Sequence, residues 1–179
     1  MKISEKPAVF LDRDGVLTKE IGYVTASEHL HLFSYAEDCI SRIHEKGYYA
    51  VVVTNQSGVA RGLFTEAMLQ EMNQYLMEQT GTDAVYYCPH HPQGKVERYR
   101  KVCRCRKPGI RMFEKACREF AIDMQNSWMV GDRAGDILAG QRAGLRTVLL
   151  ESGYGSKRLE EPVKPDYTAE DLREFLNLL

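Results

Sequence analysis

An unbroken apolar run, Ala8–Leu11, leads directly into two acidic residues, Asp12 and Asp14, followed by Gly15. Four consecutive apolar residues are typical of a strand buried on both faces, as in a parallel sheet. Ligand sites in open α/β sheets lie at the carboxyl ends of the strands. Side chains alternate along an extended chain, so we expect the two carboxylates to point the same way and Arg13 to point elsewhere.

Two carboxylates on one side of the chain make a compact, strongly negative site. Like charges this close raise the pKa of one carboxyl group, and a divalent cation relieves the repulsion. Mg²⁺ prefers such oxygen ligands. Taken alone, however, Asp-x-Asp-Gly is equally compatible with an ordinary turn, since Asp and Gly are common turn residues. The polar residues at the ends of the later strands decide between these two interpretations.

The rest of the chain alternates short apolar runs with helical periodicity. The runs predict further strands at 48–54, 84–88, 127–131 and 146–150. Helical spacing predicts helices at 35–46, about 65–79, 108–120, 136–143 and about 169–179. Strands that alternate with helices are typical of a parallel sheet with helices on both faces. We therefore expect an α/β, Rossmann-like, three-layer fold.

The second predicted helix has a clear start signal, because Thr65 is a favourable N-cap residue. Its core-facing stripe is expected to comprise Met68, Leu69, Met72, Tyr75 and Leu76. Pro108 is expected in the first turn of the third helix. Residues 18–33 lack periodicity and are interpreted as a loop over the edge that carries the acids, with His29 and His31 exposed on it.

Composition limits the class of protein. A chain of 179 residues with 44% hydrophobic residues is long enough for one well-filled core, so we expect a single domain over residues 1–179. The net charge of −1, from 24 basic and 25 acidic residues, indicates neither nucleic acid nor an anionic membrane as a partner. The chain contains no long apolar segment and no recognisable leader, which predicts a cytoplasmic protein. We expect a monomer.

A second polar cluster, Thr54-Asn55-Gln56-Ser57, follows the strand predicted at 48–54. The Thr54 hydroxyl should emerge near the two acids, and with the amides of Asn55 and Gln56 it can donate to phosphate oxygens. Arg61 adds a cation beside this loop as a substrate contact. The alternative is a Ser/Thr turn or helix cap at Thr54, with Arg61 on a solvated surface.

Two cations, Arg106 and Lys107, stand directly before the helix predicted at Pro108. The N-terminus of a helix favours anions, so this pair is placed to contact an anion; the alternative is an exposed basic pair.

A further acid, Asp132, follows the strand predicted at 127–131. Together with Asp12 and the backbone carbonyl of Asp14 it would complete an oxygen site for Mg²⁺. Asp136 stands four residues later and is assigned to the outer shell of the metal or to the cap of the next helix.

Three cysteines and a histidine form two pairs with i, i+2 spacing: Cys88 with His90, and Cys103 with Cys105. This set suits tetrahedral Zn²⁺, whereas a chance cluster is the alternative. Clustered cysteines in a cytosolic chain are more often metal ligands than disulfides. Because the intervening 93–102 segment is polar, we do not expect it to become ordered by apolar burial. A structural zinc would hold the loop at about 88–107, and His91 is the spare imidazole.

Asp12-Arg13-Asp14-Gly15-Val16-Leu17 resembles the first motif of the haloacid dehalogenase (HAD) superfamily of phosphotransferases. The resemblance implies that Asp12 is a nucleophile and Asp14 a general acid/base; a carboxylate nucleophile divides phosphate-ester hydrolysis into two steps. It also implies that Thr54 contacts substrate and that Lys107 stabilises the phosphoryl group. Related enzymes often carry a Lys where this chain has Arg133, which leaves the contact there open. The short spacing between the first two motifs along the chain leaves no room for a separate cap domain.

The cysteine-rich segment and the runs 54–62 and 103–108 resemble the D-glycero-D-manno-heptose-1,7-bisphosphate 7-phosphatase family. This resemblance implies Mg²⁺-dependent removal of the 7-phosphate in making nucleotide-activated heptose for lipopolysaccharide or surface glycans. It also implies substrate recognition by Arg106 and a sugar contact by the segment Glu20-Ile21-Gly22-Tyr23. A histidinol-phosphate phosphatase, which shares the catalytic and zinc elements, is the alternative enzyme. A zinc-stabilised binding module without activity is the alternative of another class.

Overall fold

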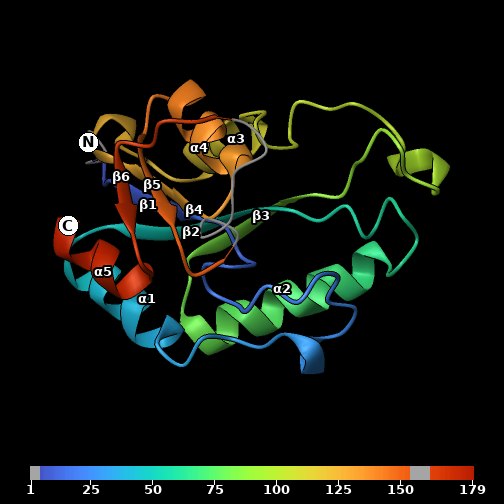
Figure 1. The fold of residues 1–179 in the computed structure, drawn as a ribbon, viewed down its shortest axis with the longest axis horizontal. Helices are drawn as coiled ribbons and strands as arrows, with labels where there is room; N and C mark the ends of the chain where they lie inside the picture. Colours follow the sequence, from blue (N-terminus) through green and yellow to red (C-terminus); the bar gives the residue numbers. More distant parts are fainter. Residues whose placement is uncertain (1–4, 154–161) are drawn as a thin grey trace.

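A six-stranded parallel sheet forms the middle of the molecule (Figure 1). The computed structural model describes residues 5–153 and 162–179. The strands are β1 (Ala8–Leu11), β2 (Tyr49–Asn55), β3 (Ala84–Cys88), β4 (Trp128–Gly131), β5 (Arg146–Leu150) and β6 (Tyr167–Ala169). Their order is β3-β2-β1-β4-β5-β6, and every pairing is parallel. The strand that precedes the two acids therefore lies inside the sheet, between β2 and β4.

Helices cover both faces of this sheet. In Figure 1, α1 (Ala36–Glu45), α2 (Glu66–Thr80) and α5 (Leu172–Phe175) lie below it, whereas α3 (Arg111–Glu119) and α4 (Ala134–Arg142) lie above. The alternation of β1 supplies both layers of core: Val9 and Leu11 pack towards α1 and α2, and Ala8 and Phe10 pack towards α3. The Phe10 and Phe113 rings meet edge to face with centroids 5.0 Å apart. The predicted three-layer α/β fold is confirmed.

Most predicted elements are present within one or two residues of their expected bounds. Thr65 caps α2, since its side chain accepts a hydrogen bond from the Met68 backbone N–H. The 18–33 segment contains one 3₁₀ turn, Ser27–His29, and a β-bridge between Thr18 and Leu32. His29 and His31 are exposed as expected. Further 3₁₀ turns lie at Glu97–Tyr99, Met124–Asn126 and Leu176–Leu178.

Two expected helix starts were wrong. The third helix begins at Arg111 rather than at Pro108, because residues 106–109 form a tight turn in which the Gly109 N–H donates to the Arg106 carbonyl. The last helix begins at Leu172, where the Asp171 side chain accepts hydrogen bonds from the Arg173 and Glu174 N–H groups. The residues before it pair with β5 as the unpredicted strand β6.

Side-chain burial corrects two further expectations. Met68 is 36% exposed and does not belong to the stripe of α2 that faces the core. The 93–102 segment was expected to lack apolar anchoring, but Tyr99 is 8% exposed and joins the main core cluster. Its hydroxyl donates to Glu66 at the start of α2 over 2.5 Å. Burial of this one aromatic ring therefore helps to hold the loop against α2.

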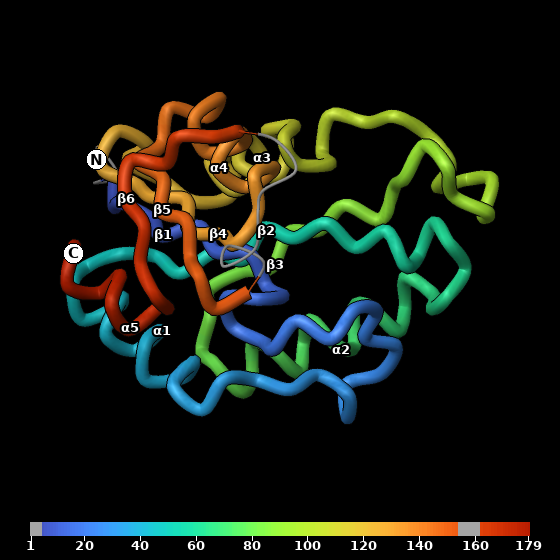
Figure 2. The backbone as a smooth tube through the Cα atoms, viewed as in Figure 1, coloured from blue at the N-terminus to red at the C-terminus, as the bar shows by residue number. Residues whose placement is uncertain are grey.

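The connections after β1, β2 and β3 extend from the carboxyl ends of these strands and comprise residues 12–35, 56–65 and 89–110 (Figure 2). The last two contact each other through a hydrogen bond from the Val96 N–H to the Ala60 carbonyl. Among the described residues no segment forms a separate cap domain. The single domain over 1–179 stays a prediction, because residues 1–4 and 154–161 lie outside the described ranges. None of the described helices combines the length and apolar character needed to cross a bilayer.

Candidate active site and metal centres

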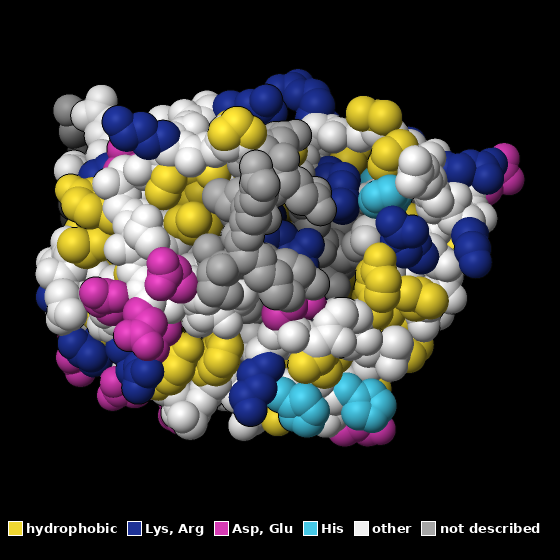
Figure 3. Space-filling view, in the orientation of Figure 1, with side chains coloured by type: hydrophobic (Ala, Val, Ile, Leu, Met, Phe, Trp, Pro, Cys, Tyr) yellow, Lys and Arg dark blue, Asp and Glu magenta, His cyan; other side chains and the backbone are white. Residues whose placement is uncertain are grey.

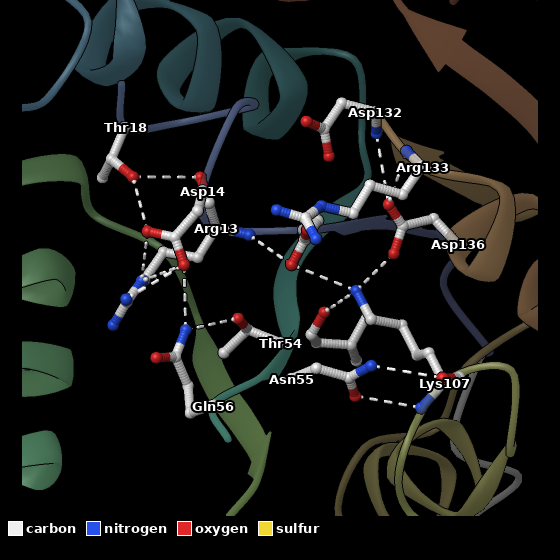
Figure 4. Close-up of polar contacts among 12 residues, drawn as sticks. Arg13, Asp14, Thr18, Thr54, Asn55, Gln56, Lys107, Asp132, Arg133 and Asp136 are labelled. Atoms are coloured by element: carbon white, nitrogen blue, oxygen red, sulfur yellow. Dashed lines mark hydrogen bonds and ion pairs between the residues drawn. The ribbon is translucent and has the colours of Figure 1, made fainter. Parts of the chain in front are cut away.

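Polar residues at the carboxyl ends of β1, β2 and β4 meet at one edge of the sheet (Figure 4). Asp12 comes directly after β1, Thr54 lies near the end of β2, and Asp132 comes directly after β4. All three side chains are buried. Parallel strands bring their carboxyl ends to the same edge, at the point where the strand order reverses direction. The predicted convergence of these groups is confirmed.

Lys107 reaches this edge from the loop between β3 and α3. Its ammonium nitrogen lies 3.0 Å from an oxygen of Asp12, 2.6 Å from an oxygen of Asp136 and 2.7 Å from the Val53 carbonyl. Three acceptors match the three N–H donors of an ammonium group. The side chain is only 2% exposed, so its charge acts on the two carboxylates with little screening by solvent.

Burial and neighbouring charges both shift the pKa values of Asp12 and Lys107. Burial raises the pKa of Asp12 from 3.8 to about 6, and the charges of Asp136 and Asp14 add to this shift while Lys107 opposes it. Burial alone would lower the pKa of Lys107, but the charges of Asp12 and Asp136 outweigh it and raise that pKa. A carboxylate that is costly to bury and next to other acids is suited to bind a cation.

Asp12, Asp132 and Asp136 form a cluster of buried carboxylates that can hold a metal ion. One oxygen from each lies within 4.8 Å of the other two. Hard oxygen donors and a surplus of negative charge fit Mg²⁺. The backbone at Gly15 passes directly beside the Asp132 carboxylate. Gly15 has φ +84°, and a Cβ there would lie 2.3 Å from Asp132 Oδ2, so a larger residue would crowd the carboxylate cluster.

Asp136 does more than the sequence indicated. Its Oδ2 accepts hydrogen bonds from the Asp132 and Arg133 backbone N–H groups, which caps the start of α4. Its other oxygen contacts Lys107. The helix-cap alternative is therefore correct, and the same side chain is also a member of the carboxylate cluster.

Asp14 does not share the environment of Asp12. Its carboxylate accepts hydrogen bonds from the Arg13 guanidinium, with Nη2 at 3.0 Å, from the Thr18 hydroxyl at 3.1 Å and from the Gln56 amide at 2.9 Å. The expectation that Arg13 points away from both acids was wrong, because the chain bends directly after β1 and the strand alternation ends there. Figure 4 shows Arg13, Thr18 and Gln56 gathered around Asp14.

Asn55 has a structural contact that sequence reasoning missed. Its side-chain amide donates to the Lys107 carbonyl at 3.2 Å, and its carbonyl oxygen accepts from the Lys107 N–H at 2.9 Å. Two reciprocal hydrogen bonds fix the backbone that carries the buried lysine. No local signal in the sequence reveals a contact between residues so far apart in the chain.

The predicted soft-ligand cluster is assembled. The ligand atoms of Cys88, His90, Cys103 and Cys105 lie within 4.8 Å of one another. Sγ of Cys105 is 2.9 Å from Sγ of Cys88, 3.1 Å from Sγ of Cys103 and 3.3 Å from Nδ1 of His90. A hydrogen bond from Cys88 lowers the pKa of the Cys105 thiol to about 5. Three sulfurs and one imidazole fit tetrahedral Zn²⁺.

A group of positive side chains lies beside the soft-ligand cluster. Arg61 Nη2 lies 3.4 Å from Nε2 of His91, and His91 is not part of the cluster. Burial lowers the pKa of His91, and the charges of Arg106 and Arg61 lower it further. Nε of Arg61 and Nη1 of Arg106 are buried without a hydrogen-bond partner among the described residues. These donors are available to an anion.

The predicted sugar-contacting segment lies at the surface. Ile21 and Tyr23 are each 51% exposed and Gly22 has φ +85°. Glu20 forms an ion pair with Arg133 over 3.0 Å, which ties this segment to the start of α4. On the face in Figure 3, basic and acidic side chains are interspersed, and basic side chains border a histidine at the right-hand end.

Comparison with known proteins identifies the family. The chain is 43% identical over 155 residues, or 83% of its length, to the D-glycero-beta-D-manno-heptose-1,7-bisphosphate 7-phosphatase of Haemophilus ducreyi, of which the alignment covers 85%. The chain belongs to the D-glycero-D-manno-heptose-1,7-bisphosphate 7-phosphatase family. A member of this family from Chlorobaculum tepidum is 38% identical over 177 residues, covering 92% of this chain and 89% of the relative.

Anomer names differ among the heptose-bisphosphate 7-phosphatases that resemble this chain. The relative from Photorhabdus laumondii is named for the alpha form; it is 37% identical over 86% of this chain and 87% of its own length. A HAD-hydrolase-like family model also matches residues 104–175.

A solved structure supports the assignment to the heptose-bisphosphate 7-phosphatase family. The D,D-heptose 1,7-bisphosphate phosphatase from B. bronchiseptica, complexed with magnesium and phosphate, has a TM-score of 0.83 and 30% identity. The similarity covers 96% of this chain and 97% of that structure. The HAD-like fold expected from the first motif is therefore confirmed along nearly the whole chain.

Proposed function

We propose that this chain is a Mg²⁺-dependent phosphatase that removes the 7-phosphate of D-glycero-D-manno-heptose 1,7-bisphosphate in the synthesis of nucleotide-activated heptose. The observation that carries the proposal is the buried Asp12 beside Lys107 at the strand ends, in a member of this phosphatase family. The balanced charge favours a monomer without nucleic-acid or membrane partners, and we expect the protein to be cytoplasmic; these points stay predictions.

The proposed reaction has two steps. An oxygen of Asp12 attacks phosphorus, and Asp14 gives a proton to the departing sugar oxygen. Asp14 then takes a proton from the water that hydrolyses the aspartyl phosphate and restores Asp12. Thr54 donates to a phosphoryl oxygen, and the charge of Lys107 stabilises the negative charge that develops.

Mg²⁺, when bound, would supply positive charge that balances the negative charge of the phosphoryl oxygens. Asp12 and Asp132, with the backbone carbonyl of Asp14, are the proposed protein ligands. Asp136 is the outer group that holds Lys107 in place. The structurally similar B. bronchiseptica enzyme is complexed with magnesium and phosphate, which supports magnesium as the metal.

A bisphosphate substrate requires a second anion subsite away from Asp12. Arg61 and Arg106 are proposed to bind the distal phosphate, because each has a buried N–H donor with no partner among the described residues. Glu20, Ile21, Gly22 and Tyr23 are proposed to contact the sugar, with Asn55 and Ser57 beside the phosphoryl group.

Rates of phosphate release with Mg²⁺ test this function. The α and β anomers of heptose 1,7-bisphosphate, histidinol phosphate and fructose 1,6-bisphosphate are compared side by side. We expect kcat/KM for one heptose anomer to exceed that for histidinol phosphate by about 100-fold, or about 2.7 kcal/mol. A preference for histidinol phosphate would support the alternative enzyme. No release from any substrate would favour the binding module.

Mg²⁺ binding is expected to weaken in acid. Because the pKa of Asp12 is about 6 without metal, protons compete with Mg²⁺ below that pH, and affinity should fall about tenfold per pH unit. Between pH 3.8 and about 6 the folded state binds more protons than the unfolded state. The free energy of unfolding of the metal-free chain should therefore decrease as pH rises through this window.

Calorimetric titration with MgCl₂ at about pH 5 and about pH 7.5, at constant ionic strength, measures the difference in affinity. Thermal unfolding without metal over the same range measures the change in stability. Equal Mg²⁺ affinity at both values would contradict the raised pKa of Asp12.

Zinc at the Cys₃His cluster is proposed to be structural. Cys105→Ser is expected to lose bound zinc and to lower kcat/KM by about 10²-fold, because Arg106 and Lys107 follow directly and small misplacements of catalytic groups are costly. Cys117→Ser is the matched control, since Cys117 is a partly buried thiol outside the cluster. Metal analysis and steady-state rates measure both effects. Full zinc content in Cys105→Ser would contradict the ligand assignment.

A further inference from the structure

The side-chain amide of Gln56 joins two groups of the proposed active site. Gln56 comes directly after β2 and is 6% exposed. Its Nε2 donates one hydrogen bond to Asp14 Oδ2 and another to Thr54 Oγ1, each over 2.9 Å (Figure 4). An amide nitrogen carries two protons, so both are used within the protein. Gln56 therefore has no amide proton left to donate to the substrate, contrary to the expectation from the sequence.

The bond to Thr54 fixes the direction of the Thr54 hydroxyl. A hydroxyl has one proton to donate, and here the oxygen serves as the acceptor for Gln56. Among the described residues no acceptor for the Thr54 proton is recorded, although the side chain is 1% exposed. The proton is therefore left for an acceptor that arrives at the strand ends, and a phosphoryl oxygen has the required chemistry.

The bond to Asp14 connects two loops. The other hydrogen bonds to the Asp14 carboxylate come from Arg13 and Thr18, which belong to the same turn after β1. Within the described part of the chain, Gln56 is the one partner from another segment. It fixes the position of the Asp14 carboxylate relative to β2 and to the Thr54 hydroxyl.

We propose that Gln56 is a positioning residue that aims the Thr54 hydroxyl at the phosphoryl group and holds Asp14 at the leaving oxygen. This inference rests on the proposed function, because it assigns Asp14 the proton transfer to the leaving group. It assigns no substrate contact to Gln56. Removing its amide therefore weakens proton transfer rather than substrate binding.

Dependence on the leaving group tests this role. 4-Nitrophenolate is a stable anion that leaves with little help from an acid, whereas a sugar alkoxide must be protonated. We expect Gln56→Leu to lower kcat/KM for the preferred sugar phosphate by about 10²-fold, mainly through kcat. The loss with 4-nitrophenyl phosphate should be about tenfold smaller. The ratio kcat/KM is used because it reports the transfer of phosphate to Asp12.

Two further variants complete the experiment. Gln70→Leu is the matched control, since the Gln70 amide also donates to a hydroxyl, that of Tyr87, but lies exposed on α2; both rates should be unchanged. Gln56→Met keeps the length of the side chain and removes both amide donors without adding a charge beside Asp14. It should reproduce the same contrast, which keeps the test decisive if Gln56→Leu folds poorly.

Equal losses on both substrates, a loss confined to KM, or no loss would each overturn the positioning role. These outcomes leave the proposed phosphatase activity intact, because the wild-type rates stand. If the wild-type chain hydrolyses neither the sugar phosphate nor 4-nitrophenyl phosphate with Mg²⁺, both proposals are overturned.

Discussion

Asp12→Asn is expected to lower kcat/KM for the preferred sugar phosphate by about 10⁴-fold or more, as measured by phosphate release with Mg²⁺. An amide oxygen is a poor nucleophile towards phosphorus and forms no stable acyl phosphate. The amide keeps nearly the shape of the carboxylate, so it can still accept a hydrogen bond from the Arg13 N–H and remain near Lys107. The loss should therefore be in chemistry and not in folding.

The matched control for this variant is Asp38→Asn, because Asp38 is an exposed acid in α1. It should retain the wild-type rate. Binding of orthophosphate to Asp12→Asn, measured by calorimetry, should persist because the donors to the phosphoryl oxygens remain. Retention of more than about one-hundredth of the wild-type kcat/KM would contradict the nucleophilic role of Asp12.

Lys107→Met is expected to lower both activity and stability. The variant removes a buried cation and leaves Asp12 and Asp136 in the interior without it. Breaking a buried ion pair by removing one partner costs about 3–5 kcal/mol. The loss of charge stabilisation should lower kcat by about 10³-fold. Chemical denaturation without metal measures the first effect, and phosphate release with Mg²⁺ measures the second.

Two comparisons separate electrostatics from packing in Lys107→Met. Lys115→Met removes a lysine whose side chain is 63% exposed and should change stability by less than about 0.5 kcal/mol. Adding Asp136→Asn to Lys107→Met should recover part of the lost stability, because one uncompensated charge is removed. If the double variant is no more stable than the single one, lost packing rather than unpaired charge explains the effect.

The sequence predicted the elements that burial determines. The strand Ala8–Leu11 and the strand Ala84–Cys88 lie where apolar runs predicted them, since a parallel sheet buries both faces of its strands. The convergence of Asp12, Thr54 and Asp132 followed from the common direction of the strands. The spacing of the cysteines and the histidine in the sequence was sufficient to predict the soft-ligand cluster.

The sequence did not predict contacts that depend on a turn or a long-range partner. The bend after β1 reverses the expected direction of Arg13, and no periodicity encodes it. The clamp between Asn55 and Lys107 joins residues 52 positions apart. Strand β6 has only three residues and becomes a strand by pairing with β5. Local pattern carries little information about such features.

The position of β1 also has a consequence for synthesis on the ribosome. β1 is made before β2 and β4, and its backbone pairs on one side with β2 and on the other with β4, where Val9 lies opposite Trp128. A growing chain therefore exposes one edge of its most apolar strand until β4 has emerged from the exit tunnel. During this interval an unpaired strand edge is open to association with other chains.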